Sequence, residues 1–414
     1  MKKLGNFKKF ELNEQLLRGI SSAGFTEPTP IQQKVIIPLL NGEDLIGQAK
    51  TGSGKTAAFG LPLLQKINIQ RKVVQAIVLA PTRELAVQIT EELRKIGKYT
   101  GIRILSIYGG QSINIQLRKL SEGVHVVVGT PGRVIDHIKR GTLQLGFVKN
   151  SIVDEADTMM DMGFIDDVEF ILNTIPYSKQ ISLFSATMPK AIIELSERYM
   201  DNPKEVLVDS DEISVDTLDQ YYIMVEQKEK LPCLIDLLNK EKPASSIIFC
   251  RTKIASSKLA RNLTYQHLNA VALHGDLSQS QRDRSMYLFR TGRANILVAT
   301  DIASRGIDIP QVDCVVNFDV PLQPLIYFHR VGRTARAGDS GKSFIFISKN
   351  NAREFARIQS LTKAVVKPFR LEDEQKAANL GKNRYQKKNR DHKQFSRKSS
   401  RRPQYYRKGR HKRR

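Results

Sequence analysis

The stretch Ala49-Lys-Thr-Gly-Ser-Gly-Lys-Thr56 is a glycine-rich turn that leads into the good helix formers Ala57-Ala-Phe59. Glycines let backbone N–H groups turn inward onto phosphate oxygens, and the N-terminus of the following helix favours negative charge. Lys55 is then suited to bridge the β- and γ-phosphates, and the Thr56 hydroxyl to ligate Mg²⁺. The alternative is a plain turn followed by a helix start. The residues predicted to surround the phosphates are Ala49, which stands where such loops usually have glycine, Lys50, Thr51, Gly52, Ser53, Gly54, Lys55 and Thr56.

A second feature downstream supplies the acidic partner that such a loop needs. The apolar run Ser151-Ile-Val153 leads directly into Asp154-Glu-Ala-Asp157. Asp154 is suited to hold Mg²⁺ through water, and Glu155 to take a proton from an attacking water. The alternative is an acidic helix N-terminus that serves the macrodipole, worth only ~0.3–1 kcal/mol. A strand ending in two adjacent carboxylates after a phosphate loop favours the catalytic interpretation.

The chain alternates short β-branched runs with helical patterns in two rounds, which predicts α/β domains with parallel sheets covered by helices. The predicted strands are Val73–Ala80, Ile102–Tyr108, Val124–Val128, Ser151–Val153 and Ile181–Ser185 in the first half, and Tyr221–Val225, Ser246–Cys250, Ala270–Leu273, Ile296–Ala299, Cys314–Phe318 and Ser343–Ile347 in the second. The similar loops Ala80-Pro-Thr-Arg83 and Cys250-Arg-Thr-Lys253 follow strands in the two halves. Ligands of open parallel sheets bind at the carboxyl ends of the strands, so these loops are where chemistry is expected.

The net charge of +24 is concentrated at the C-terminal end of the 414 residues. Residues 376–414 hold 17 Lys and Arg against one acidic residue, Asp391, and few aliphatic side chains, which predicts disorder. The interleaved aromatics Tyr385, Phe395, Tyr405 and Tyr406 are able to stack on unpaired bases while the cations neutralise phosphates. The alternative functions are a solubilising tail and, less suited without an amphipathic stripe, an anionic membrane surface.

Other classes of protein are disfavoured by composition. No apolar run approaches the ~18 residues of a membrane helix, and no apolar segment follows Met1-Lys-Lys3 as in a signal peptide. Cys233, Cys250 and Cys314 lie too far apart for a zinc site or a disulfide framework. We therefore expect a protein of the reducing cytoplasm, with no membrane partner.

Together these motifs resemble the DEAD-box family of ATP-dependent RNA helicases, whose name the tetrapeptide Asp154–Asp157 spells. The resemblance covers about residues 7 to 348 and implies two tandem RecA-like domains that use ATP and Mg²⁺. The expected boundaries are residues 1–208 for the first domain, 209–216 for an acidic linker, 217–366 for the second domain and 367–414 for a basic disordered RNA-binding tail.

The resemblance also assigns nucleotide contacts. Gln32 would read adenine, and Phe7, which is 25 residues upstream, would stack on it, with Phe10 as the nearby alternative. Asp308 would bind the ribose. Arg333 and Arg336 match the arginine fingers, and their i, i+3 spacing predicts one shared helical face.

The remaining family motifs concern RNA and its coupling to ATP. The residues implied to contact RNA are Pro81, Thr82, Arg83, Gly110, Thr130 and Arg133 in the first domain, and Arg251, Gly275, Thr300 and Asp301 in the second. The residues implied in coupling are Ser185, Thr187, Arg305 and His329. Backbone N–H groups, hydroxyls and guanidinium groups bind phosphate and do not read base edges, so little sequence preference is expected.

The predicted activity is RNA-stimulated ATP hydrolysis coupled to local unwinding of short RNA duplexes or remodelling of RNA–protein complexes. The phosphate loop lies in one half and the arginines in the other, so ATP and RNA together are expected to close the cleft between them. The pathways in which such an activity is expected are ribosome assembly or RNA turnover. The alternatives are an ATP-gated RNA clamp with little unwinding and a DNA helicase of the same superfamily.

Overall fold

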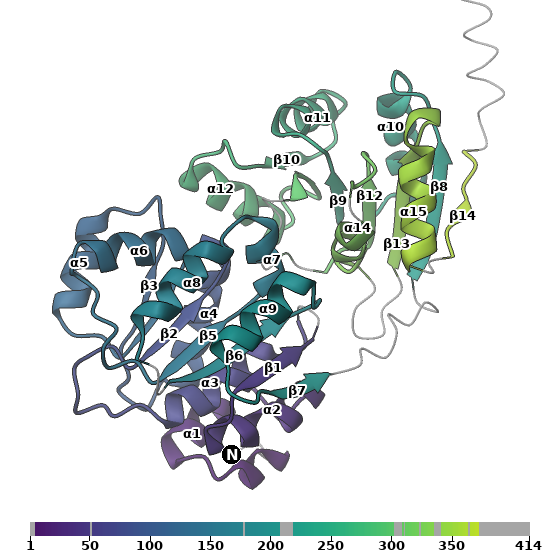
Figure 1. Cartoon of the computed structure of the whole chain (residues 1–414). Coiled ribbons are helices and arrows are strands. Elements are labelled where there is room, and N and C mark those ends of the chain that lie inside the picture. Colours follow the sequence, from purple (N-terminus) through teal and green to yellow (C-terminus); the bar gives the residue numbers. More distant parts are fainter. Residues whose placement is uncertain are drawn as a thin grey trace, which may run out of the picture.

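The computed structural model describes residues 5–49, 52–176, 179–207, 218–301, 309, 311–322, 324–334, 341–362 and 365–371. These residues form two lobes, each built on a seven-stranded parallel sheet with helices on both faces (Figure 1). The predicted α/β fold of two tandem RecA-like domains is thus confirmed. The expected linker 209–216 and residues 372–414 of the tail lie outside the described residues.

Both sheets have the same topology. Their strand orders are β3-β4-β2-β5-β6-β1-β7 and β10-β11-β9-β12-β13-β8-β14, so each sheet places its third, fourth, second, fifth, sixth, first and seventh strands side by side. The second domain therefore repeats the architecture of the first, although the two halves show no close sequence repeat.

The first domain contains the following elements. Its strands are β1 (Leu45–Gln48), β2 (Ala76–Leu79), β3 (Ile104–Ile107), β4 (Val126–Gly129), β5 (Asn150–Val153), β6 (Gln180–Ser185) and β7 (Lys204–Leu207). Its helices are η1 (Gly5–Phe10), α1 (Glu14–Ser22), α2 (Pro30–Asn41), α3 (Lys55–Gln65), α4 (Arg83–Ile96), α5 (Ile113–Ser121), α6 (Pro131–Lys139), α7 (Ala156–Asp161), α8 (Ile165–Thr174) and α9 (Lys190–Tyr199).

The second domain has the matching set. Its strands are β8 (Leu218–Met224), β9 (Ser246–Phe249), β10 (Ala270–Leu273), β11 (Ile296–Ala299), β12 (Cys314–Asn317), β13 (Gly341–Ile347) and β14 (Lys367–Pro368). Its helices are α10 (Lys230–Glu241), α11 (Lys253–Tyr265), α12 (Gln279–Arg290), α14 (Pro324–Val331), η3 (Lys349–Asn351) and α15 (Ala352–Thr362).

Apolar side chains cover both faces of each sheet, as parallel strands require. In the first domain one core joins α1 to α4 with the sheet, and a second core joins α6 to α9 with the opposite face. In the second domain α10 and α11 cover one face, while α12, α14 and α15 cover the other. All four residues of β2 and of β9 are buried, which explains why these strands are apolar apart from Ser246.

The similar loops at the two strand ends form equivalent helix caps. The Thr82 hydroxyl accepts the Leu85 N–H at 3.3 Å to cap α4, and the Thr252 hydroxyl accepts the Ala255 N–H at 3.1 Å to cap α11. A threonine N-cap satisfies one of the free N–H groups at a helix start. The same local chemistry therefore holds equivalent loops at the carboxyl edges of the two sheets.

The folded part of the second domain extends beyond the predicted boundary at residue 366. Lys367 and Pro368 pair with β8, and the Phe369 ring packs against Tyr221 and Phe344 with centroids 5.3 and 5.1 Å apart. Aromatic contacts of this kind anchor a chain segment. The described residues of the second domain therefore continue to residue 371.

Candidate active site and nucleic-acid interface

The phosphate loop connects β1 to α3 in the first domain. Gly54 has a φ of 91° at the N-cap of α3, and a Cβ there would lie 2.6 Å from Gln32 Nε2. Only glycine adopts this backbone conformation without an energetic cost, so the shape of the loop requires glycine at position 54. The buried Lys55 Nζ donates to the Ala49 carbonyl at 2.8 Å, which holds the ammonium group inside the loop. Lys50 and Thr51 lie outside the described residues.

Gln32 lies directly behind this loop. Its Nε2 donates to the Gly54 carbonyl at 3.1 Å, and its Oε1 accepts the Thr29 N–H at 3.0 Å. An amide has two donors and two acceptor lone pairs, and these two bonds use one of each. Adenine recognition by Gln32 therefore stays a prediction.

The two aromatic candidates for adenine stacking lie in the hydrophobic core. Phe7 is 0% exposed and packs edge-on against Phe10 and Phe25, with centroids 6.1 and 6.2 Å away. Phe10 is also buried. A stacking partner needs a free ring face. The structure therefore gives no support to stacking by Phe7, and its position indicates a packing role.

The acidic pair follows β5 at the carboxyl edge of the sheet. Asp154 is buried, and its Oδ1 accepts the Glu155 N–H at 3.0 Å. Glu155 has a φ of 53°, a left-handed conformation that is uncommon outside glycine and that often marks functional sites. Burial raises the pKa of Asp154, and the Lys55 charge opposes the rise. Burial and the Asp154 charge raise the pKa of Glu155 to about 7.

These residues fit a magnesium ion beside a triphosphate. A buried carboxylate whose pKa is raised by burial is stabilised by a cation. The Thr56 hydroxyl lies in the first turn of α3, on the loop that carries Lys55. Mg²⁺ is usually bound by one or two protein oxygens together with phosphate oxygens and water, which matches Thr56 and Asp154.

This site also lies within range of a positive charge from the second domain. The Arg333 charge acts on Glu155 and lowers its pKa, against the effect of burial. The helical face predicted for the arginines is wrong for Arg333, because α14 ends at Val331 and Arg333 lies in the following turn. That turn is closed by the Arg333 N–H, which donates to the Arg330 carbonyl at 3.2 Å. Arg305, Asp308 and Arg336 lie outside the described residues.

The predicted coupling residues Ser185 and Thr187 are connected to the acidic motif through Asp157, to which the sequence assigned no role. Asp157 Oδ2 accepts the N–H of Ala186 at 3.2 Å and both the N–H and the hydroxyl of Thr187 at 3.0 Å. The Ser185 hydroxyl accepts the Asp157 N–H at 3.3 Å and donates to the Thr187 carbonyl at 2.6 Å. The end of β6 is therefore fastened to the start of α7.

Three segments predicted to bind RNA meet at one edge of the first sheet. Pro81 and Thr82 precede α4, whose first residue, Arg83, lies so close to Gly110 that a Cβ there would be 2.0 Å from the guanidinium. Thr130 is the N-cap residue of α6. Arg133 then donates to the Gln111 carbonyl at 3.3 Å, in the turn that contains Gly110. The strand ends thus gather two guanidinium groups and two helix N-termini.

The second domain offers a matching edge. The exposed Arg251 follows β9, and its N–H donates to Asp319 Oδ2 at 2.9 Å. Gly275 lies 3.4 Å from Lys253 Cε, measured from an ideal Cβ, and the Thr300 N–H donates to the Leu273 carbonyl at 3.2 Å. Arg251, Gly275 and Thr300 all belong to segments that directly follow strands of one sheet.

Asp301 and His329 are tied to α14. Both Asp301 oxygens pair with the buried Arg330, at 2.5 and 2.8 Å. A carboxylate that is already paired is poorly suited to contact an RNA phosphate. The structure therefore supports a role for Asp301 in holding Arg330 and gives no support to a direct RNA contact. His329 is partly exposed on the last turn of α14.

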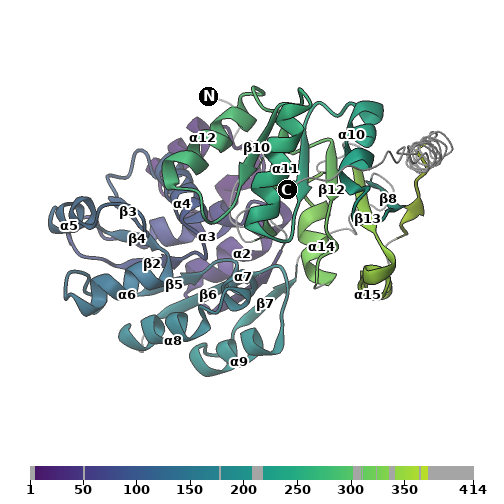
Figure 2. The same cartoon turned by 90° about the horizontal axis from the view of Figure 1, so that it is seen from above.

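An ion pair that the sequence reasoning missed joins the two domains beside the RNA segments. Arg282 of α12 lies 2.9 Å from Glu84 of α4, and α12 lies against the first domain in both overall views (Figures 1 and 2). At the same place, burial raises the pKa of Tyr108, and the charges of Asp283, Arg83 and Glu84 also act on it. Residues so far apart in sequence carry no local pattern that would predict their contact.

Comparisons with known proteins agree with this geometry. The DEAD/DEAH box helicase model matches residues 29–195, and the helicase conserved C-terminal domain model matches residues 229–338. The chain is 47% identical over 357 residues to the DEAD-box ATP-dependent RNA helicase CshA of Geobacillus kaustophilus, covering 86% of this chain and 76% of the relative.

Two structures of Saccharomyces cerevisiae Dbp5 are similar in fold, each at 33% identity. The structure bound to RNA and ADP BeF3 aligns with a TM-score of 0.79, over 92% of this chain and 99% of Dbp5. A Dbp5 variant bound to Nup159, a Gle1 variant, IP6 and ADP aligns with a TM-score of 0.61, over 90% and 99%. Among the described residues, no helix is both long and apolar enough to cross a bilayer. The matched domains and the identity to CshA show that this chain belongs to the DEAD-box family of ATP-dependent RNA helicases, whose members hydrolyse ATP.

Proposed function

We propose that this helicase binds ATP on the first domain, is completed as an ATPase by the second domain, and uses closure on RNA to open short duplexes locally. The observation that carries the proposal is the approach of the two domains at the strand ends, where Arg282 of the second domain lies 2.9 Å from Glu84 of the first and the Arg333 charge lowers the pKa of Glu155. A cation contributed by a second domain is the arrangement that makes hydrolysis depend on closure. Arg336 and Arg305 belong to the same proposal through the family resemblance alone.

The hydrolytic roles follow from the positions of the side chains. Lys55 neutralises the β- and γ-phosphates, Asp154 and Thr56 hold Mg²⁺, and Glu155 accepts the proton of the attacking water. When bound, Mg²⁺ supplies charge neutralisation at the phosphate oxygens. Arg333 stabilises the charge that develops on the transferred phosphoryl group, a contribution of about 10³–10⁵ in rate for arginine fingers.

The RNA contacts are directed to the backbone. Arg83, Arg133 and Arg251 provide guanidinium groups, and the N-terminal ends of α4, α6 and α11 provide N–H groups. Such groups recognise phosphates and sugars without reading bases, and 2′-hydroxyl contacts distinguish RNA from DNA. Binding is therefore expected to be largely independent of sequence.

Closure couples the two ligands. Each ligand contacts both domains, so each raises the affinity for the other. The TM-score of 0.79 to Dbp5 bound to RNA and ADP BeF3, against 0.61 to the Dbp5 variant bound to Nup159, a Gle1 variant, IP6 and ADP, supports an arrangement of the two domains like that of the RNA-bound relative. Asp157 is suited to transmit closure, because it joins the acidic motif to Ser185 and Thr187.

The physiological RNA is inferred from charge. A tail of 17 Lys and Arg with interleaved aromatics is suited to hold a helix next to the one that the core opens. We propose large structured RNAs of ribonucleoprotein complexes in the cytoplasm as targets, in ribosome assembly or RNA turnover.

Strand displacement on a short RNA duplex tests the proposal. The expected result is ATP-dependent displacement by the wild type, with loss of both displacement and RNA-stimulated hydrolysis in Glu155→Gln. Glu169→Gln, which removes a charge from a surface ion pair between α8 and Arg198 of α9, is the matched control and is expected to behave as wild type. ATP-dependent RNA retention without displacement would favour a clamp. Equal stimulation by DNA would favour a DNA helicase, and robust turnover by Glu155→Gln would overturn the assigned base.

A further inference from the structure

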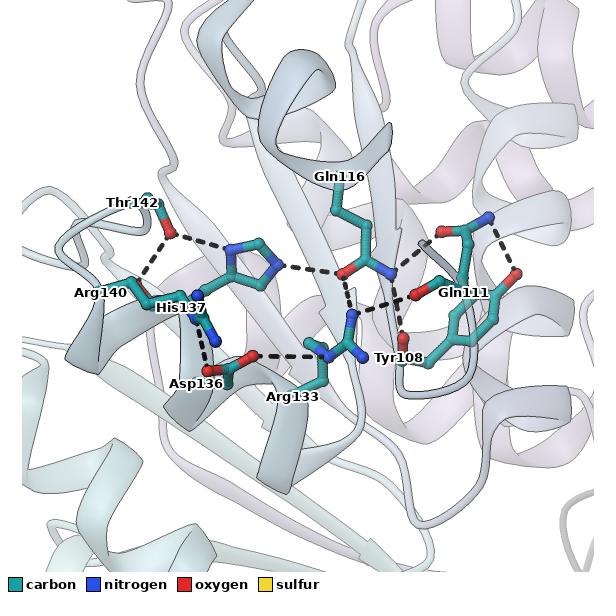
Figure 3. A network of polar contacts seen from close by, with 8 residues as sticks. All are labelled: Tyr108, Gln111, Gln116, Arg133, Asp136, His137, Arg140 and Thr142. Carbon is teal, nitrogen blue, oxygen red and sulfur yellow. Dashed lines mark hydrogen bonds and ion pairs between the residues drawn. The ribbon is translucent and has the colours of Figure 1, made fainter. Parts of the chain in front are cut away.

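Two buried polar side chains lie beneath the segments of the first domain that are predicted to bind RNA. Gln116 of α5 and His137 of α6 are both 0% exposed, and His137 Nε2 lies 3.0 Å from Gln116 Oε1 (Figure 3). Buried polar groups are costly unless their hydrogen bonds are satisfied, so such a pair needs an explanation. Neither residue belongs to a motif that was assigned a function above.

Every donor and acceptor position of the Gln116 side-chain amide has a hydrogen-bond partner. Nε2 donates to the Tyr108 carbonyl and to Gln111 Oε1, both at 3.0 Å. Oε1 accepts from His137 and from the Arg133 guanidinium, the latter at 3.3 Å. An amide offers two donors and two lone pairs, so this count is complete and permits one orientation only.

His137 fixes that orientation from the other side. Its Nε2 faces an oxygen and so carries the proton, which leaves Nδ1 as an acceptor 2.9 Å from the Thr142 hydroxyl, whose other partner is the His137 carbonyl at 3.1 Å. Burial lowers the pKa of His137, and the nearby Arg133 charge lowers it further. The imidazole is thereby kept neutral, with the tautomer that donates to Gln116.

The network joins two protein segments that are predicted to bind RNA and that are separate in sequence. One is the turn Tyr108–Gln111, which contains Gly110, and the other is the start of α6, which carries Arg133. Asp136 holds the Arg133 guanidinium from its far side at 3.8 Å and pairs with Arg140 at 2.6 Å. A long side chain that is already ordered loses less freedom when it meets a phosphate.

We propose that Gln116 and His137 are positioning residues for RNA binding, which act by setting the Arg133 guanidinium and the Gly110 turn at a fixed distance from each other. The inference rests on the proposed RNA function of those two segments. It predicts that RNA affinity depends on residues that no RNA can touch.

Gln116→Met tests this inference, because methionine keeps the length of the side chain and removes all four hydrogen bonds. We expect the RNA concentration for half-maximal ATPase stimulation to rise about tenfold, the effect of losing one well-placed charged hydrogen bond. The affinity for ADP without RNA is expected to stay at the wild-type value. Gln75→Met is the matched control, because Gln75 is a buried glutamine with three hydrogen bonds to Asn68 and Arg71, before the start of β2. Its RNA dependence is expected to be unchanged.

A double-mutant comparison separates positioning from general destabilisation. In an Arg133→Ala background, Gln116→Met is expected to change the RNA dependence less than threefold, because one of the two groups whose separation Gln116 sets is then gone. If Gln116→Met does not bind ADP, His137→Phe replaces it, since the ring is kept while both nitrogens are lost. Wild-type RNA dependence in either folded variant, or a full tenfold effect in the Arg133→Ala background, would overturn the inference. Failure of RNA to stimulate the wild type would instead refute the proposed function.

Discussion

The ion pair between Glu84 and Arg282 predicts how much of domain closure depends on a single contact. The side chains are 16% and 15% exposed and lie 2.9 Å apart, so water screens them only in part. Their attraction is about 6 kcal/mol at an effective dielectric constant of ~20, and most of it is offset by desolvation. The two groups meet as an ion pair without the alignment of a hydrogen bond. We therefore assign the contact about 1–2 kcal/mol, or about five- to thirtyfold in the closing equilibrium.

Arg282→Gln removes this contribution. The RNA concentration for half-maximal ATPase stimulation is expected to rise about five- to thirtyfold, while ADP affinity without RNA stays unchanged. Glu84→Gln is expected to match it, and the double variant to cost little more than either single one. Arg198→Gln is the matched control, because its 2.7 Å ion pair with Glu169 lies within one domain. A coupling energy below about 0.3 kcal/mol in the double-mutant cycle would refute the assigned role.

Three further predictions concern coupling, stability and the tail. Asp157→Asn is expected to reduce strand displacement more than RNA-stimulated hydrolysis, because the amide has no charge and only one oxygen to accept the donors that both carboxylate oxygens now accept; equal losses in the two assays would contradict this. Lys230→Met breaks a buried 3.0 Å pair with Asp319 and is expected to cost about 3–5 kcal/mol in chemical denaturation, whereas the exposed Lys190→Met should change stability by less than about 0.5 kcal/mol. Deletion of residues 376–414 is expected to weaken RNA binding and flatten its salt dependence between about 50 and 200 mM, and unchanged affinity at both would contradict a role in RNA binding.

The strands with continuous apolar sequence were predictable, and those without it were not. The predicted Ala270–Leu273 and Ile296–Ala299 coincide with β10 and β11. β1 was missed because Leu45–Gln48 is only four residues long and contains glycine and glutamine, although it leads into the phosphate loop. β7 was missed because three of its four residues are exposed at the edge of the sheet.

The parts of the site that lie within one motif were predictable from local chemistry. Gly54 and Lys55 take the positions that a phosphate loop requires. Asp157 was missed because its partners lie on another strand, about thirty residues away. The prediction that Arg333 lies on a helical face was wrong, because an i, i+3 pattern implies a shared face only where the helix continues and α14 ends at Val331.

The ATPase proposed here requires that Arg333 of the second domain complete the ATP site of the first. Turnover of Arg333→Gln at saturating ATP and RNA tests it directly, with ADP affinity as the measure of an intact first domain. We predict that RNA-stimulated turnover falls by about 10³-fold or more while ADP affinity is kept. Turnover within about tenfold of the wild type would contradict the claim, because an arginine finger contributes far more than that.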